Sequence, residues 1–139
     1  AAPEVAEVQV KAMSRELQLT KKANFNGRLP ETKLFNKMSS REKEEAIRQN
    51  NLYGRVICRC ETVTEGDIVA AIKAPCGAYT VDGVKRRTRA GMGRCQGGFC
   101  GPRVTQILAR ELGITVPEVL KERSGSQMFY EKFAAKEGQ

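Results

Sequence analysis

The feature that most constrains this sequence is two close pairs of cysteines. Cys58 and Cys60 are separated by one residue, and Cys95 and Cys100 are separated by four. The second pair lies in the run GMGRCQGGFCG, whose glycines allow the backbone to approach a bound group closely and to point free N–H groups at it. The pattern predicts a metal or iron–sulfur site rather than an ordinary structural loop.

The counts of histidine and cysteine narrow the ligand chemistry. The chain has no histidine, which excludes Cys2His2 zinc fingers, Rieske clusters and His-dependent catalysis. Five cysteines, an odd number, and no recognisable secretory signal favour thiolate ligands in the cytoplasm over a disulfide framework. Four thiolates can hold a [2Fe–2S] cluster or a structural zinc ion. The Cys-x-Cys spacing is shorter than that of the usual zinc knuckle and favours the cluster, with zinc as the alternative.

The formal charge of +8 is concentrated near the second cysteine pair. Between Asp82 and Glu111 there is no acidic residue, and this stretch is expected to surround the site and to stabilise an anionic cluster. Phe99 is the one aromatic residue among these bases, so the stretch does not indicate a nucleic-acid partner. The simpler alternative is a solvated helix face. The bases are Lys85, Arg86, Arg87, Arg89, Arg94, Arg103 and Arg110.

Hydrophobic spacing and capping residues predict a mainly α chain. An amphipathic helix is expected over residues 3–18, followed by an extended arm over residues 20–38 and a short strand-like entry over residues 54–58. No apolar run approaches the length of a membrane span, so we expect no direct membrane insertion. Further helices are expected from Ser39 to about Asn50, from Thr64 to before Pro75, from Thr80 to about Gly91, from Pro102 to Gly113, and from Thr115 onwards.

Residues 57–72 and 80–103 closely resemble the BFD-like [2Fe–2S] domain, the helix-turn-helix fold of bacterioferritin-associated ferredoxin. The four-residue spacing of the second pair resembles the version at the C-terminus of the flavin subunits of anaerobic glycerol-3-phosphate dehydrogenases and their relatives. The resemblance implies that four cysteines ligate the cluster: Cys58, Cys60, Cys95 and Cys100. Cys76 matches none of the family's ligand positions and is interpreted as a free loop thiol.

The resemblance also implies an organisation in three segments. Residues 1–50 look like the end of an upstream FAD-dependent domain with its connecting arm, residues 51–123 like the BFD-like domain, and residues 124–139 like a C-terminal tail. The sequence begins AAPEV rather than with Met, which suggests an excised piece of a longer protein. It contains no GxGxxG motif and no evident catalytic base, so we expect FAD only in the missing upstream domain and no catalytic site in this fragment.

The functional hypothesis is therefore an iron–sulfur electron-transfer domain of a cytoplasmic FAD-dependent dehydrogenase similar to the glycerol-3-phosphate enzymes. Its expected partners are the upstream FAD domain and an electron-accepting subunit or protein. Two alternatives stay open. One is a structural zinc-binding module, and the other is a regulatory binding module of the ferredoxin-like kind.

Overall fold

A computed structural model describes residues 2–25, 27 and 33–130 of the chain. The chain divides into two compact units, residues 1–32 and residues 33–139. Parts of the predicted arm (residues 26 and 28–32) and of the predicted tail (residues 131–139) lie outside the described residues. The three-segment division of the sequence stays a prediction.

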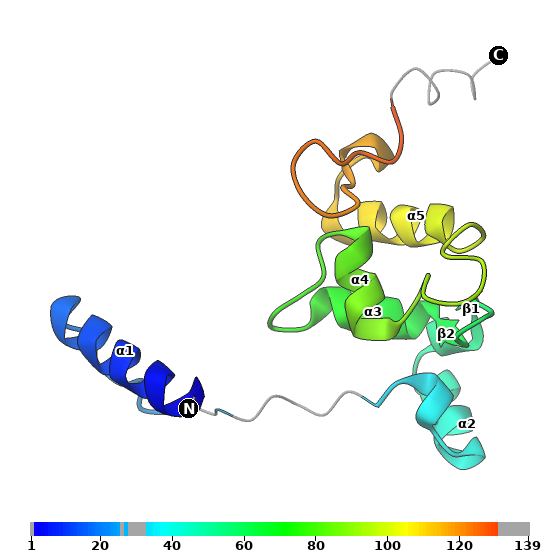
Figure 1. The fold of residues 1–139 in the computed structure, drawn as a ribbon. Coiled ribbons are helices and arrows are strands. Elements are labelled where there is room, and N and C mark those ends of the chain that lie inside the picture. The colour runs from blue at the N-terminus through cyan, green and yellow to red at the C-terminus, as the bar shows by residue number, and fades with distance from the viewer. Residues whose placement is uncertain (1, 26, 28–32, 131–139) are drawn as a thin grey trace. The chain divides into compact units, whose positions relative to one another are not determined.

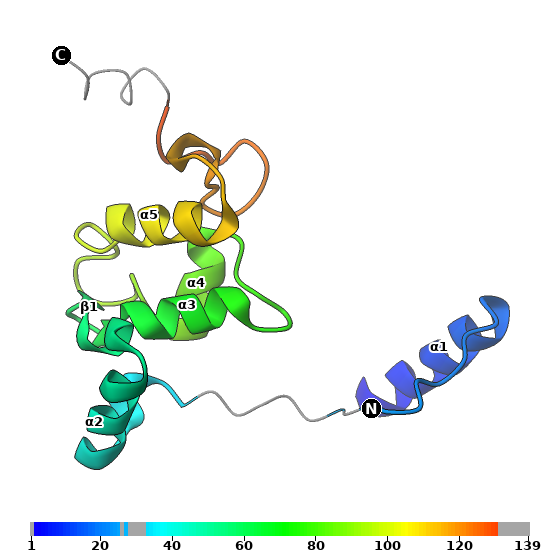
Figure 2. The same ribbon diagram turned by 180° about the vertical axis from the view of Figure 1, so that it is seen from behind.

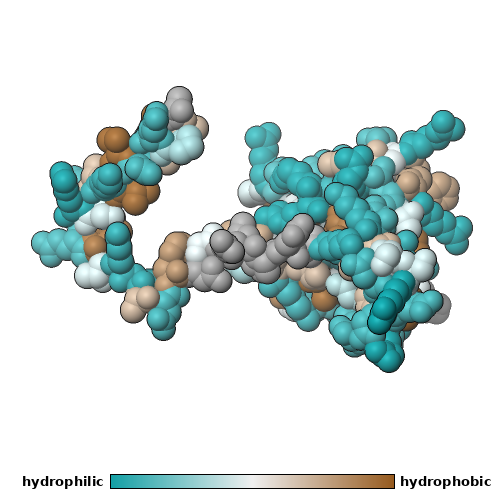
Figure 3. Space-filling model, turned by 90° about the horizontal axis from the view of Figure 1, so that it is seen from below, coloured by the Kyte–Doolittle hydropathy of each residue, from teal (hydrophilic) through white to brown (hydrophobic). Residues whose placement is uncertain are grey.

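The first unit contains helix α1 (Ala2–Glu16), which confirms the predicted N-terminal helix. None of its residues is buried within the unit. Val5, Val8 and Met13 are each more than half exposed, and apolar side chains stand open to view on this unit in Figure 3. Within the described residues, no helix combines the length and the apolar character needed to cross a membrane.

The second unit is mainly α, as predicted, and holds both cysteine pairs (Figure 1). A two-stranded antiparallel hairpin and three 3-10 turns complete it among the described residues. Its elements in chain order are η1 (Phe35–Lys37), α2 (Ser40–Gln49), η2 (Asn51–Gly54), β1 (Val56–Cys58), β2 (Val63–Thr64), α3 (Glu65–Lys73), α4 (Val81–Thr88), α5 (Gly101–Leu112) and η3 (Val116–Glu118).

The helices begin at the capping residues that the sequence indicated. Ser39 and Thr64 each form a capping box, with Glu42 and Asp67 respectively, and the hydroxyl of Thr80 accepts a hydrogen bond of 3.0 Å from the backbone N–H of Gly83. Each cap satisfies a backbone donor that the first helical turn leaves unpaired. These interactions fix where α2, α3 and α4 start, and the cap at Thr64 also marks the end of the hairpin that carries Cys58 and Cys60.

Two local predictions differ from the structure. Strand β2 was not predicted; it pairs with β1 in an irregular register that sets Val56 opposite Thr64. The helix expected from Thr115 is only the single turn η3, although its capping box forms. The chain leaves the helical path at Val119 because this side chain is fully buried in the core, and Leu120 then bridges to Gln127.

The core lies where α3, α4 and α5 pack together, an arrangement visible from both sides in Figure 1 and Figure 2. Ile68, Val84 and Leu108, one from each helix, are completely inaccessible to solvent. Cys58 and Cys100 belong to the same core, with exposures of 1% and 2%. One cysteine of each sequence pair is therefore part of the hydrophobic interior.

Candidate metal centre

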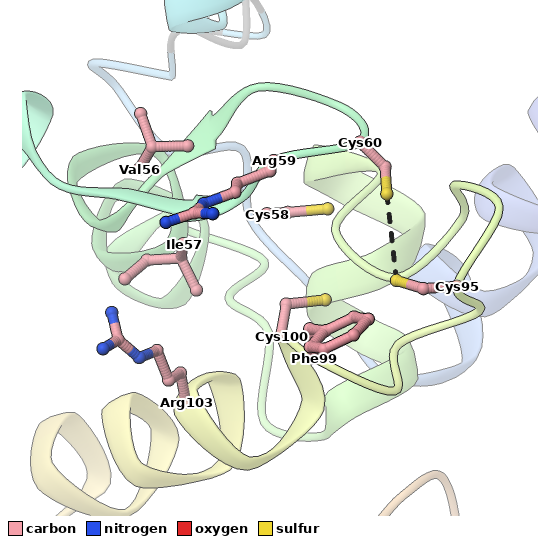
Figure 4. Close-up of a pocket in the computed structure, with 9 residues that line it drawn as sticks. All are labelled: Val56, Ile57, Cys58, Arg59, Cys60, Cys95, Phe99, Cys100 and Arg103. Atoms are coloured by element: carbon pink, nitrogen blue, oxygen red, sulfur yellow. Dashed lines mark hydrogen bonds between the residues drawn. The ribbon is translucent and has the colours of Figure 1, made fainter.

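Two loops of the second unit bring four of the five cysteines to one pocket (Figure 4). Cys58 ends strand β1, and Cys60 lies in the turn that joins β1 to β2. Cys95 lies in the glycine-rich loop between α4 and α5, and Cys100 is the N-cap residue of α5. The pocket has a volume of about 520 Å³. The structure thus places the four cysteines that the family resemblance named around one space.

Two of the four sulfur atoms approach each other closely across the two loops. Cys60 Sγ lies 3.8 Å from Cys95 Sγ, and no disulfide links any of the cysteines. Cys100 in turn lies near Cys58 and interacts electrostatically with both Cys58 and Cys95. Two sulfurs on one tetrahedral metal with bonds of about 2.3 Å are separated by about 3.8 Å. The spacing of Cys60 and Cys95 therefore suits two ligands of one metal ion.

The two pairs differ in depth. Cys58 and Cys100, called here the inner pair, are buried, whereas Cys60 is exposed and Cys95 half-buried; these two are called the outer pair. Among the described residues, no group of three or more Cys, Asp or Glu side chains is arranged to hold a single metal ion. Four sulfurs at two depths, contributed by two facing loops, fit a group with two metal atoms. The zinc alternative therefore receives no support from the geometry.

The electrostatic environment differs between the two pairs. The backbone N–H groups of Phe99 and Gly97 donate to the Cys95 sulfur and lower the pKa of this thiol. Burial, together with the neighbouring Cys58, raises the pKa of Cys100 to about 11. Burial thus outweighs the favourable position of Cys100 at the N-terminus of α5 in the metal-free protein. Amide donors therefore favour the thiolate at Cys95, and burial favours the neutral thiol at Cys100.

Gly93 explains part of the glycine requirement in the second loop. A Cβ atom at this position would lie 2.2 Å from Cys60 Cβ and 3.2 Å from Cys60 Sγ. Because real side chains do not approach so closely, only glycine allows the two loops to meet at the outer pair. Gly97 has a φ of +87°, a backbone conformation that other residues rarely adopt, and its N–H is one of the donors to Cys95.

The loop that carries Cys60 is held from outside by contacts that the sequence did not indicate. Glu61 accepts a hydrogen bond from Arg89 Nε at 2.7 Å, and its carbonyl oxygen accepts one from Asn36 Nδ2 at 3.0 Å. The backbone N–H of Phe35 donates to the buried carboxylate of Asp67 at 2.9 Å. No sequence signal could have found these contacts, because their partners lie 25 to 32 residues apart.

The basic stretch does not surround the pocket as expected. Of its seven members only Arg103 lines the pocket, together with Arg59, which lies outside the stretch. Arg86 forms an ion pair with Glu122, and Arg89 forms one with Glu61. The solvated-face alternative describes most of this stretch better.

The fifth cysteine, Cys76, is exposed on the loop between α3 and α4 and does not line the pocket.

Comparison with known proteins identifies relatives of this region. Residues 56–110 match the family described as the BFD-like [2Fe-2S] binding domain. The chain is 53% identical over 109 residues to a glycerol 3-phosphate dehydrogenase from Caloramator mitchellensis, a match that covers 78% of this chain and 23% of that protein. It is 36% identical over 109 residues to the hydrogen cyanide synthase protein HcnB from Pseudomonas aeruginosa, covering 74% of this chain and 23% of that protein.

A third relative belongs to the anaerobic glycerol-3-phosphate dehydrogenase of Escherichia coli K12, and it is 36% identical over 64 residues. This match covers 46% of the chain and 12% of the relative. The chain therefore corresponds to less than a quarter of the length of each of these proteins. No solved structure matches the chain.

Proposed function

We propose that the inner and outer cysteine pairs together ligate one [2Fe–2S] cluster and that the chain serves electron transfer in a dehydrogenase. The starting point is that residues 56–110 match the BFD-like [2Fe-2S] binding domain. The observation that carries the proposal is the convergence of four thiols in two pairs, each of which joins both loops. All four thiolates would hold the cluster, and Cys60 and Cys95 would be close enough to share one iron. A cluster of this kind, when bound, supplies one-electron redox chemistry and can split a two-electron oxidation into single steps.

The residues around the pocket suit an anionic group. The N–H groups of Gly97 and Phe99 point at the Cys95 sulfur and stabilise negative charge there. Arg59 and Arg103 line the same pocket and provide positive charge. Burial of the inner pair keeps water from one side of the site, whereas the outer pair leaves the other side accessible. The protein thus protects the group and still leaves a route for electrons to a partner.

The parent activity that we propose is an FAD-dependent oxidation of glycerol 3-phosphate or a similar substrate. The support is the 53% identity to a glycerol 3-phosphate dehydrogenase over most of this chain. In this proposal the flavin is held by a domain outside this chain, and the residues described here pass its electrons to a separate acceptor protein. We place this reaction in the cytoplasm, where reducing conditions keep thiolate ligands available.

Anaerobic purification of the 139-residue chain tests the cluster. We expect visible absorption bands, about two iron and two acid-labile sulfide per chain, and the paramagnetic signal of a one-electron-reduced cluster after dithionite treatment. A colourless protein with one tightly bound zinc would overturn the proposal.

The dehydrogenase function is tested separately. Glycerol 3-phosphate should bleach the visible bands when the flavin-containing domain is joined to this chain and should leave them unchanged with this chain alone.

A further inference from the structure

The mouth of the cysteine pocket carries apolar side chains that are open to solvent. Phe99, which precedes Cys100, is 87% exposed, and Val56 on strand β1 is 42% exposed. Both residues line the pocket, and Figure 4 shows the Phe99 ring beside the Cys100 side chain. An aromatic ring in water forgoes the stabilisation that burial provides. The Phe99 ring lies next to a proposed cluster ligand, which is where a partner protein that exchanges electrons with the cluster would cover it.

Two arginines at the same mouth have no carboxylate partner. In the part of the chain that the structure describes, neither Arg59 nor Arg103 forms an ion pair, in contrast to Arg89 with Glu61 and Arg86 with Glu122. In Figure 4 the guanidinium groups of Arg59 and Arg103 extend away from the four sulfur atoms, on the side of Ile57. Their charges are therefore available to a molecule that approaches the pocket from solvent.

The positive surface continues beyond this pocket. A second, smaller pocket of about 340 Å³ shares Ile57 and Arg103 with the first. Its lining adds Arg55, which pairs with Glu65, and Arg110, which pairs with both Glu65 and Glu111. The two pockets together are lined by four arginines and a single acid. We call this surface the arginine face, and it consists of Arg55, Val56, Ile57, Arg59, Phe99, Arg103 and Arg110.

We propose that the arginine face is the docking surface for an electron-transfer protein that presents carboxylates around an apolar centre. The proposal rests on the proposed function, because it takes the cysteine pocket to be the redox site, and it adds the chemistry of the partner. Exposed aromatic and arginine side chains are the residues enriched at the centres of protein interfaces. Unpaired positive charge around them steers an acidic partner to the face and orients it.

The charge part of the proposal is tested with two small oxidants of opposite charge. The dithionite-reduced chain, with its cluster, is mixed in stopped flow with ferricyanide, an anion, or with hexaammineruthenium(III), a cation; each reaction moves one electron from the protein to the oxidant. The variant Arg59→Gln/Arg103→Gln should lower the ratio of the ferricyanide rate to the ruthenium rate by about threefold or more at low salt. High salt should remove this difference because it screens exposed charges. A change in reduction potential alters both rates in the same direction and so cancels in the ratio.

The matched control is Arg41→Gln/Arg123→Gln, which removes two positive charges outside both pockets. Its ratio of rates should stay near that of the unmodified chain. An equal fall of the ratio in both variants, or no fall in Arg59→Gln/Arg103→Gln, would show that the arginine face has no specific charge effect and would overturn the proposal.

The apolar part is tested with rubredoxin, a small acidic iron protein, as the oxidant. Phe99→Ala should lower the second-order rate constant with rubredoxin severalfold and leave the ratio of small-ion rates unchanged. Tyr79→Ala, the control, removes another exposed aromatic side chain that lines neither pocket. Equal rubredoxin rates for Phe99→Ala and Tyr79→Ala would overturn the proposal.

Two further outcomes separate this proposal from its alternatives. A chain that is dimeric in light scattering and becomes monomeric on Phe99→Ala would assign the face to a second copy of itself and would also overturn the proposal. A chain that binds no cluster, or that neither small oxidant reoxidises, would instead refute the proposed function. The docking proposal and the functional proposal therefore fail in different ways.

Discussion

Gly93→Ala should remove the cluster by pushing apart the two loops at the outer pair. The added Cβ would lie 2.2 Å from Cys60 Cβ, and ordinary contact begins at 3.4 Å, so the two carbons have to separate by about 1.2 Å. Metal–ligand distances tolerate changes of only about 0.2 Å. Because Cys60 Sγ and Cys95 Sγ are spaced at 3.8 Å, a shift of this size takes Cys60 out of ligand position.

The same substitution should have a much smaller effect on the metal-free chain. Overpacking of this kind costs about 1–3 kcal/mol of folding free energy, and an exposed turn relaxes at the lower end of that range. The control is Gly54→Ala, where the new Cβ meets Ile47 Cγ2 at 3.7 Å, an ordinary contact. Visible absorption per chain after anaerobic reconstitution measures the occupancy, and urea unfolding of the metal-free form measures the stability. Full cluster occupancy in Gly93→Ala, at the level of Gly54→Ala, would refute the reasoning from loop contact.

Three other predictions follow from the same geometry. Replacing any one of the four pocket cysteines by serine should abolish the visible iron–sulfur bands, whereas Cys76→Ser should keep them. A normal spectrum in one of the four variants would remove that residue from the ligand set. Hydrogen exchange over residues 58–100 should be much faster in the metal-free chain than in the cluster-bound chain, and equal protection would show that the helices stand without the cofactor. In the metal-free chain the pKa of Cys95 is lowered and that of Cys100 is raised to about 11. Iodoacetamide at neutral pH should therefore alkylate Cys95 before Cys100, and Cys100 should react only as the pH rises toward 11. Mass spectrometry of tryptic peptides checks this order, and simultaneous labelling would contradict it.

The sequence predicted the helices because their starts depend on neighbouring residues. Ser39 needs only Glu42, three residues on, and Thr64 needs only Asp67. Hydrophobic spacing then sets the face that each helix buries. The same local rule overestimated the length of the helix after Thr115. A capping box is present there, but the chain turns into the core after one turn, where Val119 is buried. Local signals identify a helix start better than a helix length.

The sequence predicted which cysteines come together at one pocket, but not how they are arranged there. Four cysteines in two close pairs indicated a shared site, yet the sequence pairs are not the pairs that form in space, since Cys60 lies against Cys95 and Cys58 against Cys100. The basic stretch was misread for a related reason. The partners of Arg86 and Arg89 are 36 and 28 residues away, so nothing in the stretch itself shows that these charges are already paired.

The membership of Cys58 and Cys100 in the hydrophobic core has a consequence for the cell. In the function proposed above, a change in iron supply acts on the same residues that hold α3, α4 and α5 together. When iron is scarce, newly made chains keep an unfilled pocket next to their interior and open more often. Proteases degrade chains in proportion to the time they spend open. Iron scarcity should therefore shorten the lifetime of this protein, so that its abundance follows the supply of the metal.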